Sequence, residues 1–519
     1  MSLFKSVATV GGFTMASRIL GFIRDILIAT VLGAGPVSDA FFVAFRIPNM
    51  FRRLVAEGAF SAAFIPLFSK ELELNSKEDA LQFAAHALGF LTGFLFLFSA
   101  LFMIFMPFLM QYLAPGFEIT GDRFALAVDY TRITFPYLTA MAVVALLGGV
   151  LNAFYKFAAM SAAPILLNII LISALVFLLL NTSYEAGLIL SFGVAAAGIA
   201  QVIFLIIACK KEQVLPPLIW PRFTKKIKRL FQLMLPGLLG AGVLQINILV
   251  GTIIASLLAT GSISYLYYAD RVYQLPLGVI GIAVGTALLP MLSRQLRAGD
   301  DVPANDTMNR AVELSLLFTL PAAGALMTID YPIISVLFEH GEFGSYASQT
   351  TSEALFAFST GLPAYVLTKV YAPGFFARED TTTPVVIGVI AMAINIALSL
   401  LLIDSLAHMG IAYATSIAAW VNAITLLILL RLRGHYQVDS RLMRRTLGSF
   451  GATIIMCAVL WFGMSSLDFL LTADGLIPRI GGLCILVAGG GTVYGLAGLL
   501  LGATRLSDLK AMLRRRRTS

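Results

Sequence analysis

Apolar residues in this chain of 519 residues fall into long runs that short polar or basic segments separate. A helix of about 20 apolar residues is long enough to cross the hydrocarbon core of a bilayer. The hydrophobic windows between the polar breaks predict fourteen such helices. The predicted spans are 6–33, 37–68, 82–111, 123–152, 158–181, 185–209, 228–258, 263–293, 309–338, 350–377, 384–404, 408–432, 446–470 and 478–502. The pattern predicts an all-α, polytopic membrane protein.

Composition agrees with this fold class and narrows the range of functions. Hydrophobic residues make up 59% of the chain, charged residues only 12%, and the mean hydropathy is +0.89, whereas soluble domains carry about 25% charged residues. The three cysteines and four histidines show no metal-ligand spacing, so we expect no metal and no cofactor. The sequence contains no P-loop pattern (GxxxxGKS or GxxxxGKT), so uphill transport would use an ion gradient, the membrane potential or another protein.

Lysine and arginine gather in every second predicted loop, which indicates the orientation of the chain. The N-terminus, the loops after even-numbered spans and the C-terminal tail are basic, whereas the opposite side carries only Arg123 and Arg479. Because basic residues accumulate on the cytoplasmic side of short loops, we expect both termini in the cytoplasm. A basic inner surface that faces anionic lipids accounts for the net charge of +8, so we expect membrane lipids and no nucleic acid as partners.

Two parts of the chain resemble each other and indicate an internal repeat. Residues 35–46 (GPVSDAFFVAFR) echo 261–271 (GSISYLYYADR), and 66–70 (PLFSK) echo 290–294 (PMLSR). Copies about 225 residues apart that share one direction predict two parallel six-helix lobes, with helices 13 and 14 left over. The expected domains are an N-lobe at 1–209, a cytoplasmic linker at 210–230, a C-lobe at 231–432, and helices 13 and 14 with a basic cytoplasmic tail at 433–519.

Eight cationic side chains lie inside stretches that are otherwise apolar enough to span a membrane. A guanidinium at the bilayer centre costs about 2.5–3.5 kcal/mol, so several such residues are retained only where they face water, a partner or a ligand. Arginine suits phosphate, because its planar fork donates paired hydrogen bonds and keeps its charge in a low-dielectric environment. The surplus of cations over nearby acids predicts an anionic ligand, and a diphosphate fits it. The eight residues are Arg18, Arg24, Arg46, Arg52, Arg53, Arg132, Arg271 and Lys369.

These cations differ in their depth in the predicted spans. Arg18 and Arg24 lie near the middle of the first span, too far from the interface for snorkelling, which favours a ligand-binding role in a water-filled cavity. Asp25 is seven residues from Arg18 and shares its helix face, whereas Arg24 is rotated by about 120° from Arg18. In the second span, Pro48 is expected to kink or interrupt the helix. Structural or interfacial roles are favoured for Arg46, Arg53 and Arg132.

Four long motifs occur in order along the chain. They are SRILGFIRD at 17–25, GAGPVSDAFFVAFRIPNMFRRLVAEGAFSAAFIPLFS at 33–69, YYADRVYQLPLGVIGIAVGTALLP at 267–290 and APGFFAREDTTTP at 372–384. They resemble the MurJ (MviN) lipid II flippases of the multidrug/oligosaccharidyl-lipid/polysaccharide exporter superfamily. The resemblance implies a two-lobe transporter of the bacterial inner membrane that moves lipid II, an undecaprenyl-diphosphate-linked disaccharide pentapeptide, to the outer leaflet for peptidoglycan synthesis.

The resemblance also implies roles for individual residues. The essential cavity arginines of the family fall on Arg18, Arg24, Arg52 and Arg271, which are the expected substrate ligands. The expected gating or cavity charges are Asp39, Glu57 and Lys369, together with Asp25. Helices 13 and 14 are implied to form a groove for the lipid tail, and a partnership with cell-wall synthesis proteins stays open.

The energy source and rival functions also stay open. Some family members are thought to bind sodium, but spans 7 and 11 here offer few suitable groups, and cycling driven by the membrane potential is an equal alternative. A drug or cation antiporter of the same superfamily is the alternative function, and it predicts an acidic cavity. A membrane glycosyltransferase would need a catalytic residue in a sizeable external loop, and the loops near 339–350 and 470–478 are short. We therefore expect a transporter and not an enzyme.

Overall fold

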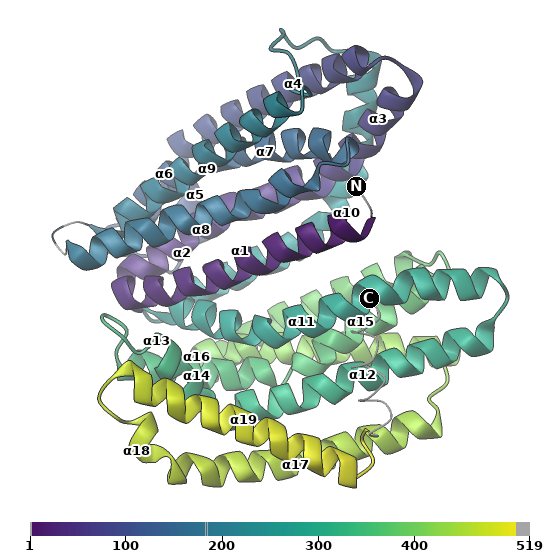
Figure 1. Ribbon diagram of the computed structural model, residues 1–519. Helices are drawn as coiled ribbons and strands as arrows, with labels where there is room; N and C mark the ends of the chain where they lie inside the picture. The colour runs from purple at the N-terminus through teal and green to yellow at the C-terminus, as the bar shows by residue number, and fades with distance from the viewer. Residues whose placement is uncertain (1–2, 182, 184, 505–519) are drawn as a thin grey trace. The chain divides into compact units, whose positions relative to one another are not determined.

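The computed structural model describes residues 3–181, 183 and 185–504 (Figure 1). These residues form helices and connecting segments, and no strand occurs within these ranges. They divide into two compact units: the first contains the residues up to 264 together with 340–343, and the second contains 265–339 and the residues from 344 onward. The predicted all-α class is confirmed, whereas the lobe and linker boundaries stay predictions.

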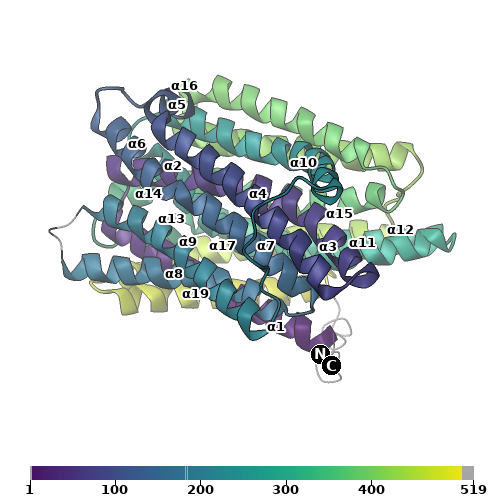
Figure 2. The same cartoon turned by 90° about the horizontal axis from the view of Figure 1, so that it is seen from above.

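The first unit is a bundle in which α7 occupies a central place. Its helices are α1 (Leu3–Leu32), α2 (Pro36–Phe51), the π-helix η1 (Arg52–Phe60), α3 (Ser61–Leu74), α4 (Lys77–Ile104), α5 (Met106–Leu113), α6 (Asp122–Thr134), α7 (Pro136–Ala153), α8 (Phe157–Leu180), α9 (Ala186–Lys211) and α10 (Lys225–Ser256). Helix α7 contacts both α4 and α9 (Figure 2). The most apolar window of α6 and α7 is 72% buried, whereas that of α4 is only 22% buried. The outer face of α4 is therefore suited to lipid.

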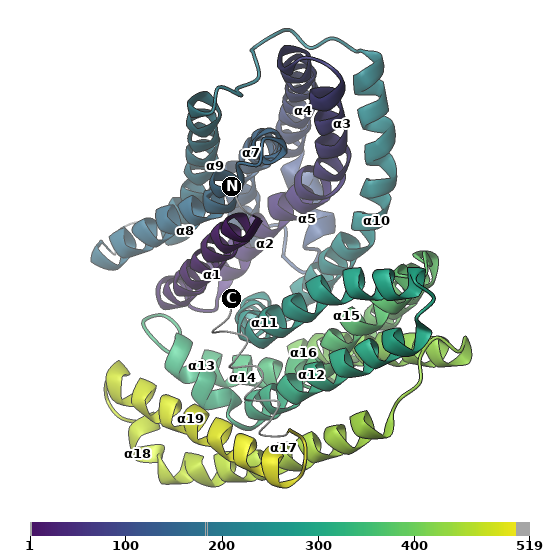
Figure 3. The same cartoon turned by 45° about the vertical axis from the view of Figure 1, so that its right-hand side comes forward.

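The second unit packs its core between α12, α15 and α16. Its helices are α11 (Ser262–Arg297), which starts in the first unit, α12 (Asp301–Thr328), α13 (Asp330–Phe338), α14 (Ser345–Ser359), α15 (Leu362–Phe376), α16 (Thr382–Leu432), α17 (Ser440–Ser466), α18 (Asp468–Leu471) and α19 (Leu476–Leu500). Met308, Val312, Val370 and Leu430 belong to the buried core. Helix α17 contacts both α12 and α19 (Figure 3).

Eight helices in the described part of the chain are long and apolar enough to cross a membrane. One of them, α16, contains a break at Ala407, where φ is 47°. A Cβ at Gly410 would lie 2.7 Å from the carbonyl oxygen of Leu402, although eight residues of a straight helix span about 12 Å. The chain therefore reverses between the predicted spans 384–404 and 408–432. The total of fourteen spans stays a prediction.

Pro48 interrupts the regular hydrogen bonding of α2, as the sequence predicts. Proline has no N–H to donate to the carbonyl of Ala44, and the hydroxyl of Thr134 on α6 donates to that oxygen instead, at 2.9 Å. Four residues after the proline, the helix continues as the π-helix η1. A side chain of a neighbouring helix thus satisfies the backbone group that the proline leaves without its normal partner.

We expect Thr134→Val to destabilise the protein by about 1–2 kcal/mol, because the isosteric side chain leaves the buried Ala44 carbonyl without its donor. Thermal unfolding of the purified protein in detergent measures the effect. Thr131→Val is the matched control, since the equally buried Thr131 hydroxyl bonds only within its own helix, to the Ala127 carbonyl. Equal losses of stability in the two variants would contradict this explanation.

Candidate functional site

Arg24 on α1 is buried and held by three hydrogen bonds. Its Nε and Nη2 donate to Oδ1 of Asp25 at 3.1 and 2.7 Å, and its Nη1 donates to Oδ1 of Asn168 on α8 at 3.0 Å. The exposed fractions of the Arg24 and Asp25 side chains are 8% and 3%. The guanidinium carbon also lies 5.9 Å from the ring centroid of Phe45. A charged group inside α1, which contains the first predicted span, is therefore fixed in one position.

The pairing of Asp25 differs from the arrangement that helical periodicity predicts. A spacing of seven residues places Asp25 on the face of Arg18, but the structure pairs its carboxylate with the adjacent Arg24. The long arginine side chain reaches around the helix to its sequence neighbour. Arg18 itself lies on an exposed face of α1. The two arginines of this helix thus have different environments.

Asn168 is a residue of this site that the sequence interpretation missed. Its Oδ1 accepts from Arg24, and its Nδ2 donates to the backbone carbonyl of Ser17 at 2.9 Å. One amide therefore bridges α1 and α8 and fixes the guanidinium. The sequence signal that could have found it is an amide in the middle of an apolar helix whose mean hydropathy reaches 2.7. A polar residue in such a helix usually has a partner in the protein.

Asp39, an expected gating charge, binds backbone groups at the start of α11. Its Oδ2 accepts from the N–H of Gly261 at 2.7 Å, and its Oδ1 accepts from the N–H of Ser264 at 3.0 Å. The Ser264 hydroxyl lies 2.7 Å from the same Oδ1 and 2.9 Å from the hydroxyl of Ser38. Arg123 approaches Oδ2 at 3.7 Å. The carboxylate therefore anchors the first residues of a helix, where N–H groups lack partners in their own helix.

Arg52 lies at the start of η1 and is half-buried. Its Nε donates to Oδ1 of Asn49 at 3.1 Å, so a residue of the preceding turn orients the side chain. The Arg52 guanidinium thus lies where the helix changes from α to π geometry, and such segments occur often at functional sites. The side chain of Glu57, another expected gating charge, lies outside the described residues.

Two of the cations that were favoured for structural roles contact neighbouring helices of the first unit. Arg46 donates to the hydroxyl of Thr252 on α10 at 2.8 Å. Arg132 donates through Nε to the carbonyl of Met103 on α4 at 3.0 Å, and its side chain is 40% exposed. Arg53 is exposed on η1. These contacts agree with structural roles for Arg46 and Arg132, which stay predictions.

The remaining two expected site residues belong to the second unit. Arg271 on α11 donates through Nη2 to the Tyr267 hydroxyl at 2.9 Å, and its guanidinium carbon lies 4.7 Å from the centroid of the Tyr267 ring. Lys369 on α15 is exposed and passes α11 closely, since a Cβ at Gly281 would lie 3.0 Å from its Nζ. The expected ligand set is therefore divided between the two units. Within the described residues, no group of three His, Cys, Asp or Glu side chains could hold a metal.

Known proteins share both the sequence and the fold of this chain. The family profile described as "Lipid II flippase MurJ" matches residues 28–473. A Rhizobium meliloti (strain 1021) protein named "Probable lipid II flippase MurJ" is 43% identical, over 99% of this chain and 97% of its own length. The solved structure "Lipid II flippase MurJ, inward closed conformation" has a TM-score of 0.77 at 26% identity and covers 95% of this chain and 98% of its own.

A more distant structure shares the fold alone. An inward-facing multidrug resistance MATE family transporter of the MOP superfamily has a TM-score of 0.70 at 14% identity, over 82% of this chain and 98% of its own. The family assignment rests instead on the profile match over most of the chain and on the relative that is 43% identical over nearly its full length. This chain belongs to the MurJ family of lipid II flippases, which are membrane transporters and not enzymes.

Proposed function

We propose that this multi-pass inner-membrane protein moves lipid II from the inner to the outer leaflet by alternating access, and that its arginines bind the diphosphate of the lipid. The fixed guanidinium of Arg24 in the first membrane helix is the observation that carries this proposal. The proposed substrate ligands are Arg18, Arg24, Arg52 and Arg271, and the proposed gating or cavity charges are Asp25, Asp39, Glu57 and Lys369. The transport step serves peptidoglycan synthesis, cell-wall biogenesis and cell shape.

Asp25 and Asn168 prepare Arg24 for an anion. The carboxylate and amide oxygens fix the guanidinium before any ligand arrives, so little side-chain entropy is lost on binding. A diphosphate offers acceptor oxygens like those of Asp25 but carries more charge, so it can replace the carboxylate as the partner of Arg24. Asp25 thereby keeps a buried cation neutralised while no substrate is bound.

The burial of Arg24 is consistent with a transport cycle of several conformations. Because only 8% of its side chain is exposed, an anion reaches it only after the surrounding helices move. Alternating access supplies such a movement. We propose that the membrane potential acts on these cations, at about 2.3 kcal/mol per charge per 100 mV. We also propose that both termini lie in the cytoplasm and that the protein associates with cell-wall synthesis proteins.

The drug or cation antiporter is the weaker alternative, although MATE transporters share the fold. A cation site needs acidic side chains that are available to the ligand. Among the described side chains of the first unit, two acids are buried and both are already engaged, since Asp25 binds Arg24 and Asp39 binds the N–H groups of Gly261 and Ser264. This arrangement favours an anionic substrate.

We expect Arg24→Ala and Arg52→Ala each to reduce flipping about tenfold or more, because each removes charge-assisted hydrogen bonds of about 1.5–3 kcal/mol to the diphosphate. A leaflet-resolved assay of lipid II in cells depleted of their own flippase measures the effect, with expression checked in parallel. Arg132→Ala is the control, since Arg132 binds a backbone carbonyl and is 40% exposed. Normal flipping in both cavity variants at normal expression would rule out diphosphate capture by these arginines.

We expect Asn168→Leu to slow flipping about fivefold or more while Arg24 keeps its charge, because the guanidinium loses the amide that positions it. The same leaflet assay applies. Asn181→Leu is the matched control, because Asn181 ends the same helix and bonds only the carbonyl of Phe177 at an exposed site. If the two variants flip lipid II equally well, Asn168 does not position Arg24 for transport.

A further inference from the structure

The short loop between α13 and α14 contains residues that belong to a different unit from the helices on either side. Residues 340–343, which we call the strap, are part of the first unit, whereas α13 and α14 are parts of the second unit. In the predicted topology this loop follows the ninth span, which places it on the external side. The end of α1, after the first predicted span, lies on the same side.

The strap caps the end of α1. The N–H of Glu342 donates to the backbone carbonyl of Thr30 at 3.0 Å. Thr30 is in the last turn of α1, which ends at Leu32, and the final four carbonyl groups of a helix have no N–H partner within the helix itself. A residue from a distant part of the chain therefore supplies the donor that this end of α1 needs.

Two glycines allow the backbones of the strap and of α1 to approach closely. Gly33, directly after α1, and Gly341 in the strap have φ angles of 60° and 58°, in the left-handed region that favours glycine. A Cβ at Gly33 would lie 2.4 Å from the carbonyl oxygen of Glu342, and a Cβ at Gly341 would lie 2.3 Å from that of Thr30. Neither position accepts a side chain unless the strap moves away from α1.

The loop that carries the strap starts from a fixed point in the second unit. Nη2 of Arg479 lies 3.2 Å from Oε1 of Glu339, and both side chains are 18% exposed. Nε of Arg479 donates to the carbonyl of Leu471 at 3.1 Å. These three residues all belong to the second unit. The base of the loop is therefore bound to the second unit, while the strap at its tip is bound to α1.

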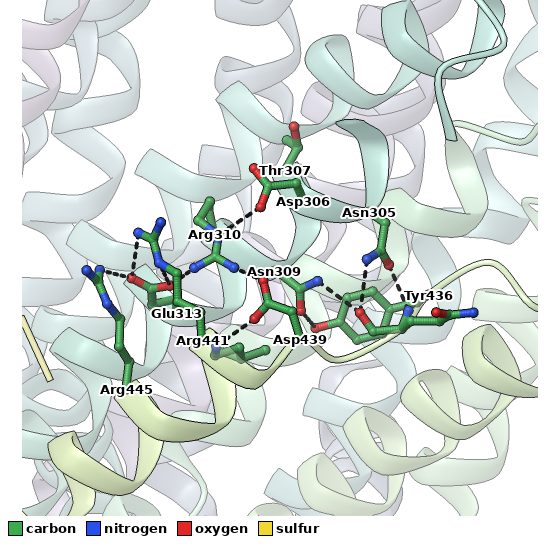
Figure 4. A network of polar contacts seen from close by, with 12 residues as sticks. Asn305, Asp306, Thr307, Asn309, Arg310, Glu313, Tyr436, Asp439, Arg441 and Arg445 are labelled. Carbon is green, nitrogen blue, oxygen red and sulfur yellow. Dashed lines mark hydrogen bonds and ion pairs between the residues drawn. The ribbon is translucent and has the colours of Figure 1, made fainter. Parts of the chain in front are cut away.

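The polar network at the start of α12 differs from the strap, because all its members belong to the second unit (Figure 4). The Tyr436 hydroxyl donates to Oδ1 of Asn309 at 2.9 Å, and both Arg441 and Arg445 bind the carboxylate of Glu313. A movement of the whole unit leaves these contacts intact. The same movement pulls on the strap, because its base moves with the second unit and its tip is bound to the first.

We propose that the strap is an external latch, which binds the end of α1 while the external side of the protein is closed and releases Thr30 when that side opens. The latch rests on the proposed transport by alternating access, in which one half of the protein moves against the other. Arg24 precedes Thr30 by six residues in α1, about 9 Å along the helix axis. Release of the strap thus frees the end of the helix that carries a proposed diphosphate ligand.

Reversible cross-linking of the strap to α1 tests this proposal. Cysteines replace Thr30 and Glu342 in a chain whose native Cys209, Cys457 and Cys484 are changed to serine, and a short bis-methanethiosulfonate reagent joins the new pair. We expect flipping to fall about tenfold or more on cross-linking and to recover after reduction, because a latch that cannot release blocks opening. The leaflet-resolved lipid II assay in cells depleted of their own flippase measures both steps.

The matched control joins cysteines at positions 339 and 479, at the base of the same loop. Glu339 and Arg479 belong to one unit, so this cross-link is expected to leave flipping unchanged. Each variant is compared with itself: flipping before cross-linking tests the proposed transport, and the change on cross-linking tests the latch. Normal flipping with the strap fully cross-linked, or an equal loss in the control, overturns the proposal.

A labelling experiment that needs no transport tests the release of the strap directly. Gly341→Val forces a side chain against the Thr30 carbonyl, whereas Gly344→Val is the control, since a Cβ at Gly344 meets nothing within 4 Å and its φ is −82°. In the cysteine-free chain, we expect Thr30→Cys to react with an impermeant sulfonated maleimide about fivefold faster beside Gly341→Val than beside Gly344→Val, because α1 loses its cover. Equal labelling rates would contradict the latch, whatever the outcome of the transport assay.

Discussion

Polar groups inside membrane helices must find their partners within the protein, because hydrocarbon offers none, and the arrangement of the first unit depends on this requirement. The Thr134 hydroxyl supplies the donor that Pro48 cannot give to the Ala44 carbonyl. The Asp39 carboxylate accepts from N–H groups at the start of α11. Each contact joins segments that are far apart in the sequence, so the groups that are most costly to bury also determine how the helices pack.

Arg24 illustrates the difference between stability and function. A buried ion pair contributes little to stability on balance, because desolvation of the two charges offsets their attraction. Replacement of a buried ion pair by apolar residues of similar volume is often neutral or stabilising. We therefore attribute the charges to the proposed diphosphate ligand, with which membership of a lipid II flippase family is consistent. Asn168 agrees with this explanation, because its buried amide orients the guanidinium of Arg24.

Hydropathy predicted the all-α membrane class, and the structure describes eight helices that are long and apolar enough to cross a membrane, because the property that drives insertion is local in the sequence. The break at Ala407 falls between two predicted spans, and the interruption predicted at Pro48 takes the form of a π-helix. The side-chain contacts of the polar residues could not be predicted in the same way. Periodicity assigns a residue to a face, but a long side chain can leave that face, as Arg24 does when it reaches Asp25. Nor could it reveal Asn168, whose role depends on a helix 144 residues away.

The ion pair between Arg24 and Asp25 also affects the insertion of α1 into the membrane during synthesis. Arg24 and Asp25 belong to the same helix, so they can pair before the helices that follow α1 have been made. Asn168 is synthesised 144 residues later, roughly 7–30 s at ordinary rates of translation. An unpaired arginine would face the full cost of insertion during that interval. The adjacent aspartate can thus neutralise Arg24 before Asn168 has been synthesised.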